Sequence, residues 1–183
     1  VWGGLTLLLH AAISNFARMH APLIVAVNGA AAGAGFSLAL CGDLVLAARS
    51  AKFTLAYTAI GLVPDGGATY FLPRVVGLRR AQELILSNRR LVAEEALEWG
   101  IVTQVVDDAE LPEATTALAT RIASGPTRAF GAVKRMLAAS YHSTLEAQMD
   151  LEGSEIAAAS VTADGREGVS AFLAKRPAVF TGG

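Results

Sequence analysis

A chain of 183 residues, of which 53% are hydrophobic and 17% charged, is long enough to bury a substantial core in one globular unit. Its formal net charge of −1 provides no field that would attract a polyanion, and no helix-length basic stripe is present, so nucleic acid is not an expected partner. Glycine or polar and charged residues interrupt every long apolar run, which argues against a membrane span.

The first part of the chain predicts a helix, a buried strand and a glycine-rich loop. The sequence begins at Val1 without a methionine or a signal-peptide pattern, so we expect a segment upstream of it. Residues 5–19 carry apolar side chains at helical spacing, and the apolar run 23–27 predicts a strand that ends at an Asn-Gly turn. The stretch 29–35, rich in glycine and alanine, leads into a predicted buried helix at 36–40. Strand, loop and helix in this order are the scaffold of a site.

The rest of the chain changes from mixed to purely helical. Further strands are predicted at 43–47, 51–55 and 101–106. Short helices are predicted at 66–76, 79–87 and 93–99, and longer ones at 111–123, 127–141, 144–160 and 165–175. We therefore expect an α/β core over residues 1–123 and a helical region over residues 124–183. The amphipathic helices of that region predict burial against a partner subunit.

The glycine-rich loop at 29–35 has the composition of an anion site. Backbone N–H groups without bulky neighbours lie where a helix begins, and helix starts carry unpaired N–H groups with partial positive charge. The loop lacks the Gly-Lys-Ser/Thr of a Walker loop and the third glycine of a dinucleotide fingerprint. Tight packing of the strand on the helix also requires small residues, and spacing alone favours that explanation.

One serine lies in a sequence close to a nucleophile elbow. Gly35-Phe36-Ser37-Leu38-Ala39 approaches Gly-x-Ser-x-Gly, and Asp65 and His142 follow in the order of an α/β-hydrolase triad. The elbow requires serine on the turn directly after its strand, whereas Ser37 falls inside the predicted helix, and Ala39 replaces the last glycine. A hydrolase is therefore a minor alternative.

The turn Pro64-Asp65-Gly66-Gly67 lies between an apolar run and a predicted helix, and its aspartate has two interpretations. Asp65 can be the N-cap of a helix that begins at Gly66, since aspartate is among the best cap residues. It can instead be a partly desolvated carboxylate suited to proton transfer. Local chemistry alone favours the cap.

Other polar side chains are weaker candidates. Cys41 is the only cysteine, so no internal disulfide can form and a reducing cytoplasm is expected. No Cys/His cluster has metal-ligand spacing, so no metal is expected. Cys41 and His10 are expected in the core, whereas His20 and His142 are expected on the surface near helix ends. The arginine pairs are expected to be solvated, with contact of a few of them to ligand phosphates as the alternative: Arg79 and Arg80, and Arg89 and Arg90.

Several ordered blocks of the sequence form a larger pattern. The blocks are Ile24-Val25-Ala26-Val27-Asn28-Gly29, Ala31-Ala32-Gly33-Ala34-Gly35, Asp43, Ala51-Lys52-Phe53, Gly61 through Thr69, Leu72-Pro73-Arg74, Glu167-Gly168 and Ala171 through Arg176. In this order they resemble the crotonase (enoyl-CoA hydratase/isomerase) superfamily over essentially the whole chain. The resemblance implies a spiral of ββα units with a C-terminal helical region that assembles trimers, often paired into hexamers. The N-terminal part of the family fold is expected to be absent from this chain.

The resemblance also implies acyl-CoA chemistry with no cofactor, since the coenzyme A thioester is itself the substrate. The family holds the thioester enolate between two backbone N–H groups. The match places one of them at Ala34, between Gly33 and Gly35, and the other upstream of this chain. Phe172 and Lys175 would contact coenzyme A bound to a neighbouring subunit, so a homotrimer or hexamer is the expected assembly.

The acid/base residue distinguishes members of the superfamily. By resemblance, hydratases carry glutamates at the positions of Ser37 and Tyr57, and this chain has neither. Dienoyl-CoA isomerases and the ring-1,2-epoxyphenylacetyl-CoA isomerases of phenylacetate degradation carry an aspartate at the position of Asp65. The segments 148–152 and 180–182 are most similar to the second group. An isomerase with Asp65 as acid/base and Tyr57 in the substrate pocket is the predicted function. A hydratase and a non-catalytic acyl-CoA-binding subunit are the alternatives.

Overall fold

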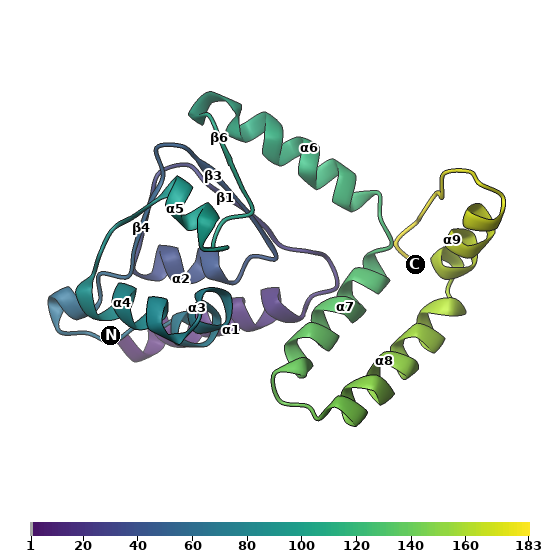
Figure 1. The fold of residues 1–183 in the computed structure, drawn as a ribbon, viewed down its shortest axis with the longest axis horizontal. Coiled ribbons are helices and arrows are strands. Elements are labelled where there is room, and N and C mark those ends of the chain that lie inside the picture. The colour runs from purple at the N-terminus through teal and green to yellow at the C-terminus, as the bar shows by residue number, and fades with distance from the viewer. Residues whose placement is uncertain (1) are drawn as a thin grey trace. The chain divides into compact units, whose positions relative to one another are not determined.

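The computed structural model describes residues 2–183 and divides them into two compact units (Figure 1). The first unit holds the chain up to Ala17 together with Leu23–Ala117, and the second holds Arg18–Pro22 and Leu118–Gly183. The boundary predicted after residue 123 lies at the end of a helix, and the role of residues 124–183 in trimer assembly stays a prediction. No helix in the described part of the chain is long and apolar enough to cross a membrane.

The first unit repeats two strands followed by a helix. After α1 (Trp2–Arg18), its first repeat is β1 (Ile24–Val27), β2 (Ala30–Ala32) and α2 (Ala34–Leu40). Its second repeat is β3 (Leu44–Ala48), β4 (Lys52–Thr54), the short 3₁₀ helix η1 (Thr58–Ile60) and α3 (Ala68–Val76). Equivalent strands pair in parallel, with Ile24 opposite Leu44 and Ala30 opposite Lys52. This arrangement confirms the predicted spiral of ββα units.

The next elements include β5 (Leu91–Val92) and β6 (Gln104–Val106), the third strand of each sheet. The helices among them are α4 (Leu78–Ser87), α5 (Ala93–Glu98), η2 (Asp108–Glu110) and α6 (Leu111–Ala123), and the division between the two units falls within α6. The sheets have the orders β1-β3-β6 and β2-β4-β5. Phe36 of α2 and Phe53 of β4 are fully buried with ring centroids 5.3 Å apart, and Leu72 and Leu84 are buried in the same core. Each such side chain stabilises the fold by about 1.5–3 kcal/mol.

Two strands were not predicted from the sequence. β2 is made of three alanines, which have low strand propensity, and only its parallel pairing with β4 makes it a strand. β5 has two residues, too few for a periodic pattern, and it pairs antiparallel with β4. The other predicted elements are confirmed, with shifts of a few residues at their ends.

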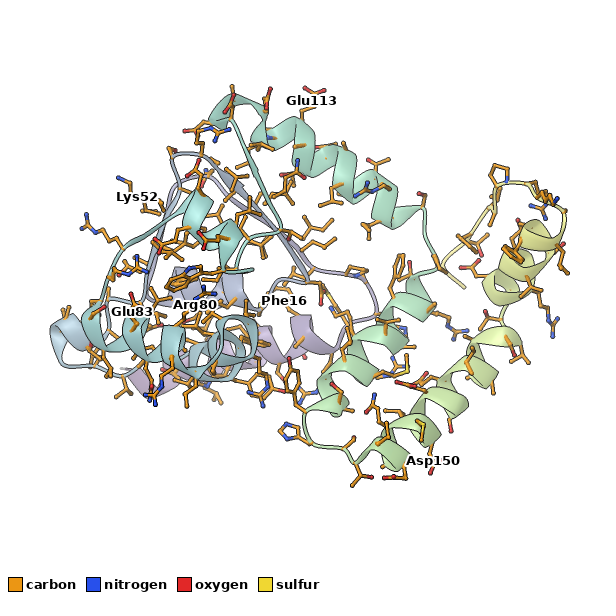
Figure 2. The ribbon with its side chains drawn as sticks, in the orientation of Figure 1. Phe16, Lys52, Arg80, Glu83, Glu113 and Asp150 are labelled. Atoms are coloured by element: carbon orange, nitrogen blue, oxygen red, sulfur yellow. The ribbon has the colours of Figure 1, made fainter. Side chains whose placement is uncertain are left out.

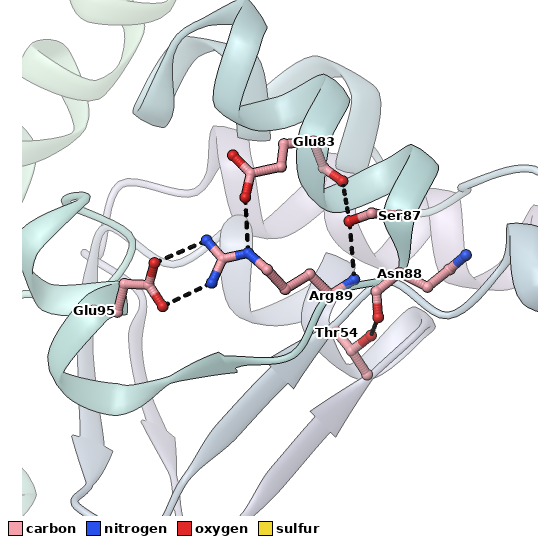
Figure 3. A network of polar contacts seen from close by, with 6 residues as sticks. All are labelled: Thr54, Glu83, Ser87, Asn88, Arg89 and Glu95. Atoms are coloured by element: carbon pink, nitrogen blue, oxygen red, sulfur yellow. Dashed lines mark hydrogen bonds and ion pairs between the residues drawn. The ribbon is translucent and has the colours of Figure 1, made fainter.

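Arg89, predicted to be solvated, is 33% exposed and is also paired with carboxylates. Its guanidinium donates to both carboxylate oxygens of Glu95, at 2.9 and 2.8 Å, and to Glu83 at 2.8 Å (Figure 3). Arg89 and Arg80 both lie over the Trp99 ring, with their Cζ atoms 5.0 and 4.6 Å from its centroid. The bidentate pair and the ring contacts tie α4 to α5 across the β5 connection.

The second unit contains α7 (Thr127–Ser140), α8 (Leu145–Ser160) and α9 (Ala163–Leu173), as predicted. Arg135 of α7 pairs with Glu155 of α8 at 3.0 Å, and Thr144 caps α8 by accepting from the Ala147 N–H. Figure 2 shows the side chains along these helices, with Asp150 labelled on α8. Large apolar side chains are exposed on them, among them Val133, Leu137, Met149, Ile156 and Phe172. Their burial in a trimer stays a prediction.

Two carboxylates attach the C-terminal segment to α9. Asp164, only 4% exposed, accepts from the backbone N–H groups of Thr181 and Gly182 at 2.7 and 2.8 Å. Glu167 accepts from Arg176 at 2.6 Å and from the Val179 N–H at 2.9 Å. The N–H of Thr181 lowers the pKa of Asp164, and Arg176 lowers the pKa of Glu167 to about 2. Arg176 thus pairs with a carboxylate of α9, the helix that precedes it.

The attachment predicts an acid-sensitive second unit. Because Glu167 titrates near 4.5 in the unfolded chain and near 2 in the folded one, its stabilising contribution is complete above pH 4.5. We expect that contribution to be lost as the pH falls from 4.5 to about 2. Thermal unfolding followed by circular dichroism across this window should show a shallower decline for Glu167→Gln than for the parent. Glu152→Gln, an exposed glutamate of α8, is the matched control and should decline like the parent. Equal slopes for Glu167→Gln and parent would contradict the assignment.

Candidate active site

The glycine-rich loop of the first unit fixes the start of α2. Gly33 has φ 53° and ψ −123°, a left-handed conformation that favours glycine, and its N–H donates to the Thr54 carbonyl at 3.0 Å. Ala34, the exposed first residue of α2, has one of the N–H groups for which a helix offers no internal partner. Gly35 follows and is also exposed. The loop therefore presents small residues and a backbone donor at the surface of the unit.

Ser37 lies inside α2, as the sequence predicts, and its side chain is completely buried. Its Oγ lies 3.1 Å from the Tyr57 hydroxyl and 3.3 Å from the Gly33 carbonyl oxygen. A buried serine whose side-chain neighbour is a tyrosine has neither the exposure nor the histidine base that an elbow requires. The hydrolase alternative is therefore wrong.

Tyr57 connects α2 to the Pro-Asp-Gly-Gly turn. Tyr57 lies in the loop after β4 and directly follows Ala56. The φ of Ala56 is 56°, which is unusual for a residue with a side chain. The half-buried Tyr57 hydroxyl donates to Asp65 Oδ1 at 2.6 Å, a short, charge-assisted hydrogen bond. Burial, and then the bond to Asp65, raise the pKa of Tyr57, so the phenol keeps its proton.

The interpretation of Asp65 as a helix cap is wrong. α3 begins at Ala68, and its N-cap is Gly67, with no side-chain cap hydrogen bond. Asp65 is half-buried and uses its side chain to accept from Tyr57 instead. Gly66, with φ 60°, packs on α2 so closely that a Cβ there would lie 2.9 Å from the Ser37 Cβ. Glycine at this position lets the turn approach the helix.

His10 belongs to the same cluster, which the sequence did not predict. It is exposed rather than in the core, so that expectation is wrong, whereas Cys41 is buried as expected. The His10 Nε2 atom accepts from the Gly66 N–H at 3.1 Å, which places an imidazole from α1 next to the turn that carries Asp65. The two residues are far apart in sequence, and helical periodicity contains no signal for such a contact.

The structure brings most of the predicted site residues together. Gly33, Ser37, Tyr57 and Asp65 form one continuous set of contacts in the first unit, and Ala34 follows Gly33 in the chain. The two predicted coenzyme A contacts, Phe172 and Lys175, belong to the second unit at the end of α9, where both are exposed. Within residues 2–183, no three His, Cys, Asp or Glu side chains are grouped as metal ligands.

Comparison with known proteins identifies the family. The sequence profile described as "Enoyl-CoA hydratase/isomerase" matches residues 8–183. The chain belongs to the enoyl-CoA hydratase/isomerase family. It is 49% identical over 170 residues to the 1,2-epoxyphenylacetyl-CoA isomerase of Escherichia coli (strain K12). That alignment covers 93% of this chain and 65% of that protein. It is 47% identical over 161 residues to a probable enoyl-CoA hydratase of Rhodobacter capsulatus, in an alignment that covers 88% of this chain and 63% of that protein.

Solved structures of the family have the same fold. An enoyl-CoA hydratase/isomerase from Cupriavidus metallidurans CH34 superposes with a TM-score of 0.91 at 39% identity, over 99% of this chain and 68% of that one. The chain thus spans about two thirds of the length of these relatives. Among enoyl-CoA hydratase/isomerase family members with similar sequences are both a named isomerase and a probable hydratase. Similarity alone therefore leaves the reaction to be argued from the site.

Proposed function

We propose that the chain forms part of an acyl-CoA isomerase that shifts a double bond, or isomerises a ring epoxide, through a thioester enolate. The observation that carries the proposal is the bonded set Ser37–Tyr57–Asp65. Where the resemblance places the two glutamates of hydratases, this chain has two hydroxyl groups that contact each other. Asp65 is the carboxylate of the set, and one carboxylate can remove a proton and return it to a different carbon.

The proposed reaction assigns separate roles to Asp65 and Ala34. Asp65 removes a proton from the acyl chain, and the electron pair of the broken C–H bond passes to the thioester oxygen. By resemblance, the Ala34 N–H and a second N–H from an upstream segment hold that oxygen while it carries negative charge. The electron pair then returns to carbon, and Asp65 delivers the same proton at a different position, so that no cofactor is required.

The binding assignments are carried over from the family. We propose that Gly33 and Gly35 let the thioester approach the Ala34 N–H, because neither residue has a side chain to obstruct it. We propose that Tyr57 borders the acyl chain. Phe172 and Lys175, exposed at the end of α9, would contact coenzyme A held by a neighbouring subunit of a trimer or hexamer in the cytoplasm.

Two assays of the full-length protein test this function. A panel of coenzyme A thioesters at about 100 times Kd should raise the unfolding free energy by about 2.7 kcal/mol for thioesters that bind. An unsaturated thioester that binds should then be isomerised, with a change in the absorbance of the conjugated thioester, while crotonyl-CoA should be hydrated slowly or not at all. Rapid hydration would favour the hydratase alternative. Binding without turnover of any thioester would favour a non-catalytic subunit.

A further inference from the structure

A chain of hydroxyl groups leads from α2 to the Asp65 carboxylate. A phenol has one proton, and the Tyr57 proton points to Asp65 Oδ1 across 2.6 Å. The Tyr57 oxygen can therefore only accept in its 3.1 Å contact with Ser37. The single Ser37 proton has two acceptors within reach, the Tyr57 oxygen and the Gly33 carbonyl oxygen at 3.3 Å. When it points to Tyr57, the hydrogen bonds run from serine to tyrosine to aspartate. They end on one of the two carboxylate oxygens.

The surrounding residues hold these hydroxyl groups in one geometry. Ser37 is completely buried, and Gly66 leaves no room for a side chain between the turn and Ser37. Ala56 adopts a left-handed backbone conformation immediately before Tyr57, which is disfavoured for a residue with a Cβ. Such strain persists where the neighbouring structure overdetermines the position. The tyrosine hydroxyl is therefore held in place from both sides.

We propose that Tyr57 is a positioning residue which occupies Asp65 Oδ1 and so makes Oδ2 the oxygen that takes and returns the substrate proton, with Ser37 holding Tyr57. The inference rests on the proposed function, because it assigns the proton to Asp65. The transferred proton passes from the acyl carbon to Oδ2 and back to carbon. Tyr57 and Ser37 keep their own protons throughout.

This role explains the chemistry of the two positions where hydratases carry glutamates. Tyr57 cannot act as a base near neutral pH, because burial and the bond to Asp65 raise its pKa further above the ordinary value of 10. Serine is a weaker acid still. The two hydroxyl groups therefore cannot deprotonate a water molecule, but Tyr57 can orient one carboxylate through its hydrogen bond, and Ser37 contacts Tyr57. The same substitutions that remove the hydratase pair support a single-carboxylate isomerase.

The test removes single hydroxyl groups. Tyr57→Phe keeps the ring and should lower kcat for isomerisation about 10-fold with KM changed less than about twofold. Tyr70→Phe, on the exposed face of α3, is the matched control and should behave like the parent.

A double variant separates the two positioning residues. Ser37→Ala leaves the Tyr57–Asp65 bond in place and should lower kcat only about threefold. Because Ser37 acts through Tyr57, the pair Ser37→Ala with Tyr57→Phe should be no slower than Tyr57→Phe alone. Multiplied effects of the two substitutions would show that Ser37 acts independently and would overturn its assigned role.

A second measurement does not depend on turnover. The ¹³C NMR chemical shift of the Asp65 carboxyl carbon, recorded at neutral pH, reports the hydrogen bond that this carboxylate accepts from Tyr57. The chemical shift should change in Tyr57→Phe, which removes that bond, and stay unchanged in Tyr70→Phe. An unchanged chemical shift in Tyr57→Phe would overturn the inference. A parent protein that isomerises no thioester would refute the proposed function, and the NMR comparison would still decide whether Tyr57 binds the Asp65 carboxylate.

Discussion

Asp65→Asn should reduce isomerisation by about 10²- to 10⁴-fold, the contribution typical of a general acid/base. The asparagine has nearly the same shape, and its amide oxygen can still accept from the Tyr57 hydroxyl, so the turn should keep its geometry. The lost property is basicity, because an amide cannot take a proton at neutral pH. The loss should therefore appear in kcat, while the affinity for the coenzyme A thioester remains.

Three measurements check this prediction: turnover of an unsaturated thioester, its Kd by calorimetry, and the thermal unfolding midpoint. Asp150→Asn removes an exposed carboxylate of α8 and should leave all three as in the parent. A fully active Asp65→Asn would eliminate Asp65 as the acid/base. Loss of binding together with turnover would show a structural role, which the retained hydrogen bond to Tyr57 argues against.

The sequence predicted the scaffold of this site better than its contacts. The apolar strand 24–27, the small residues after it and the helix that follows are local features, so their periodicity and turn residues are sufficient to place Ala34 and Ser37. The strand β2 escaped prediction because alanine becomes strand-like here only through a partner more than twenty residues away. Helix content in the second unit was predictable because each helix carries its own stop signals.

The chemical meaning of Asp65 was not predictable from its neighbours. An aspartate before two glycines looks like a helix cap, and only the start of α3 at Ala68 shows that the N-cap is Gly67, two residues after Asp65. Resemblance to the family singled out Asp65 by the absence of glutamates at Ser37 and Tyr57. The hydrogen bonds among these three residues, and the contact of His10, depend on the packing of four separate elements and have no local signature.

Ala34→Pro should slow isomerisation by about 10²- to 10³-fold, or about 3 kcal/mol of transition-state stabilisation, because it removes the N–H that we propose as a donor to the oxyanion. Proline is well tolerated at the first position of a helix, where the missing N–H has no helical partner. The preceding residue is also compatible, since a proline disfavours the helical ψ range and Gly33 has ψ −123°. The substitution should therefore remove a donor without disturbing α2.

The chain offers a matched control for this proline. Ala163 is the first residue of α9, and Thr162 before it has ψ 163°, so Ala163→Pro makes the same change at another helix start. Ala163→Pro should unfold at nearly the same temperature as the parent and retain its activity. If Ala34→Pro folds equally well but also turns over at the parental rate, the Ala34 N–H does not stabilise the enolate. A slow Ala34→Pro with an unchanged thioester Kd would place the lost interaction in the transition state, where a developing oxyanion needs it most.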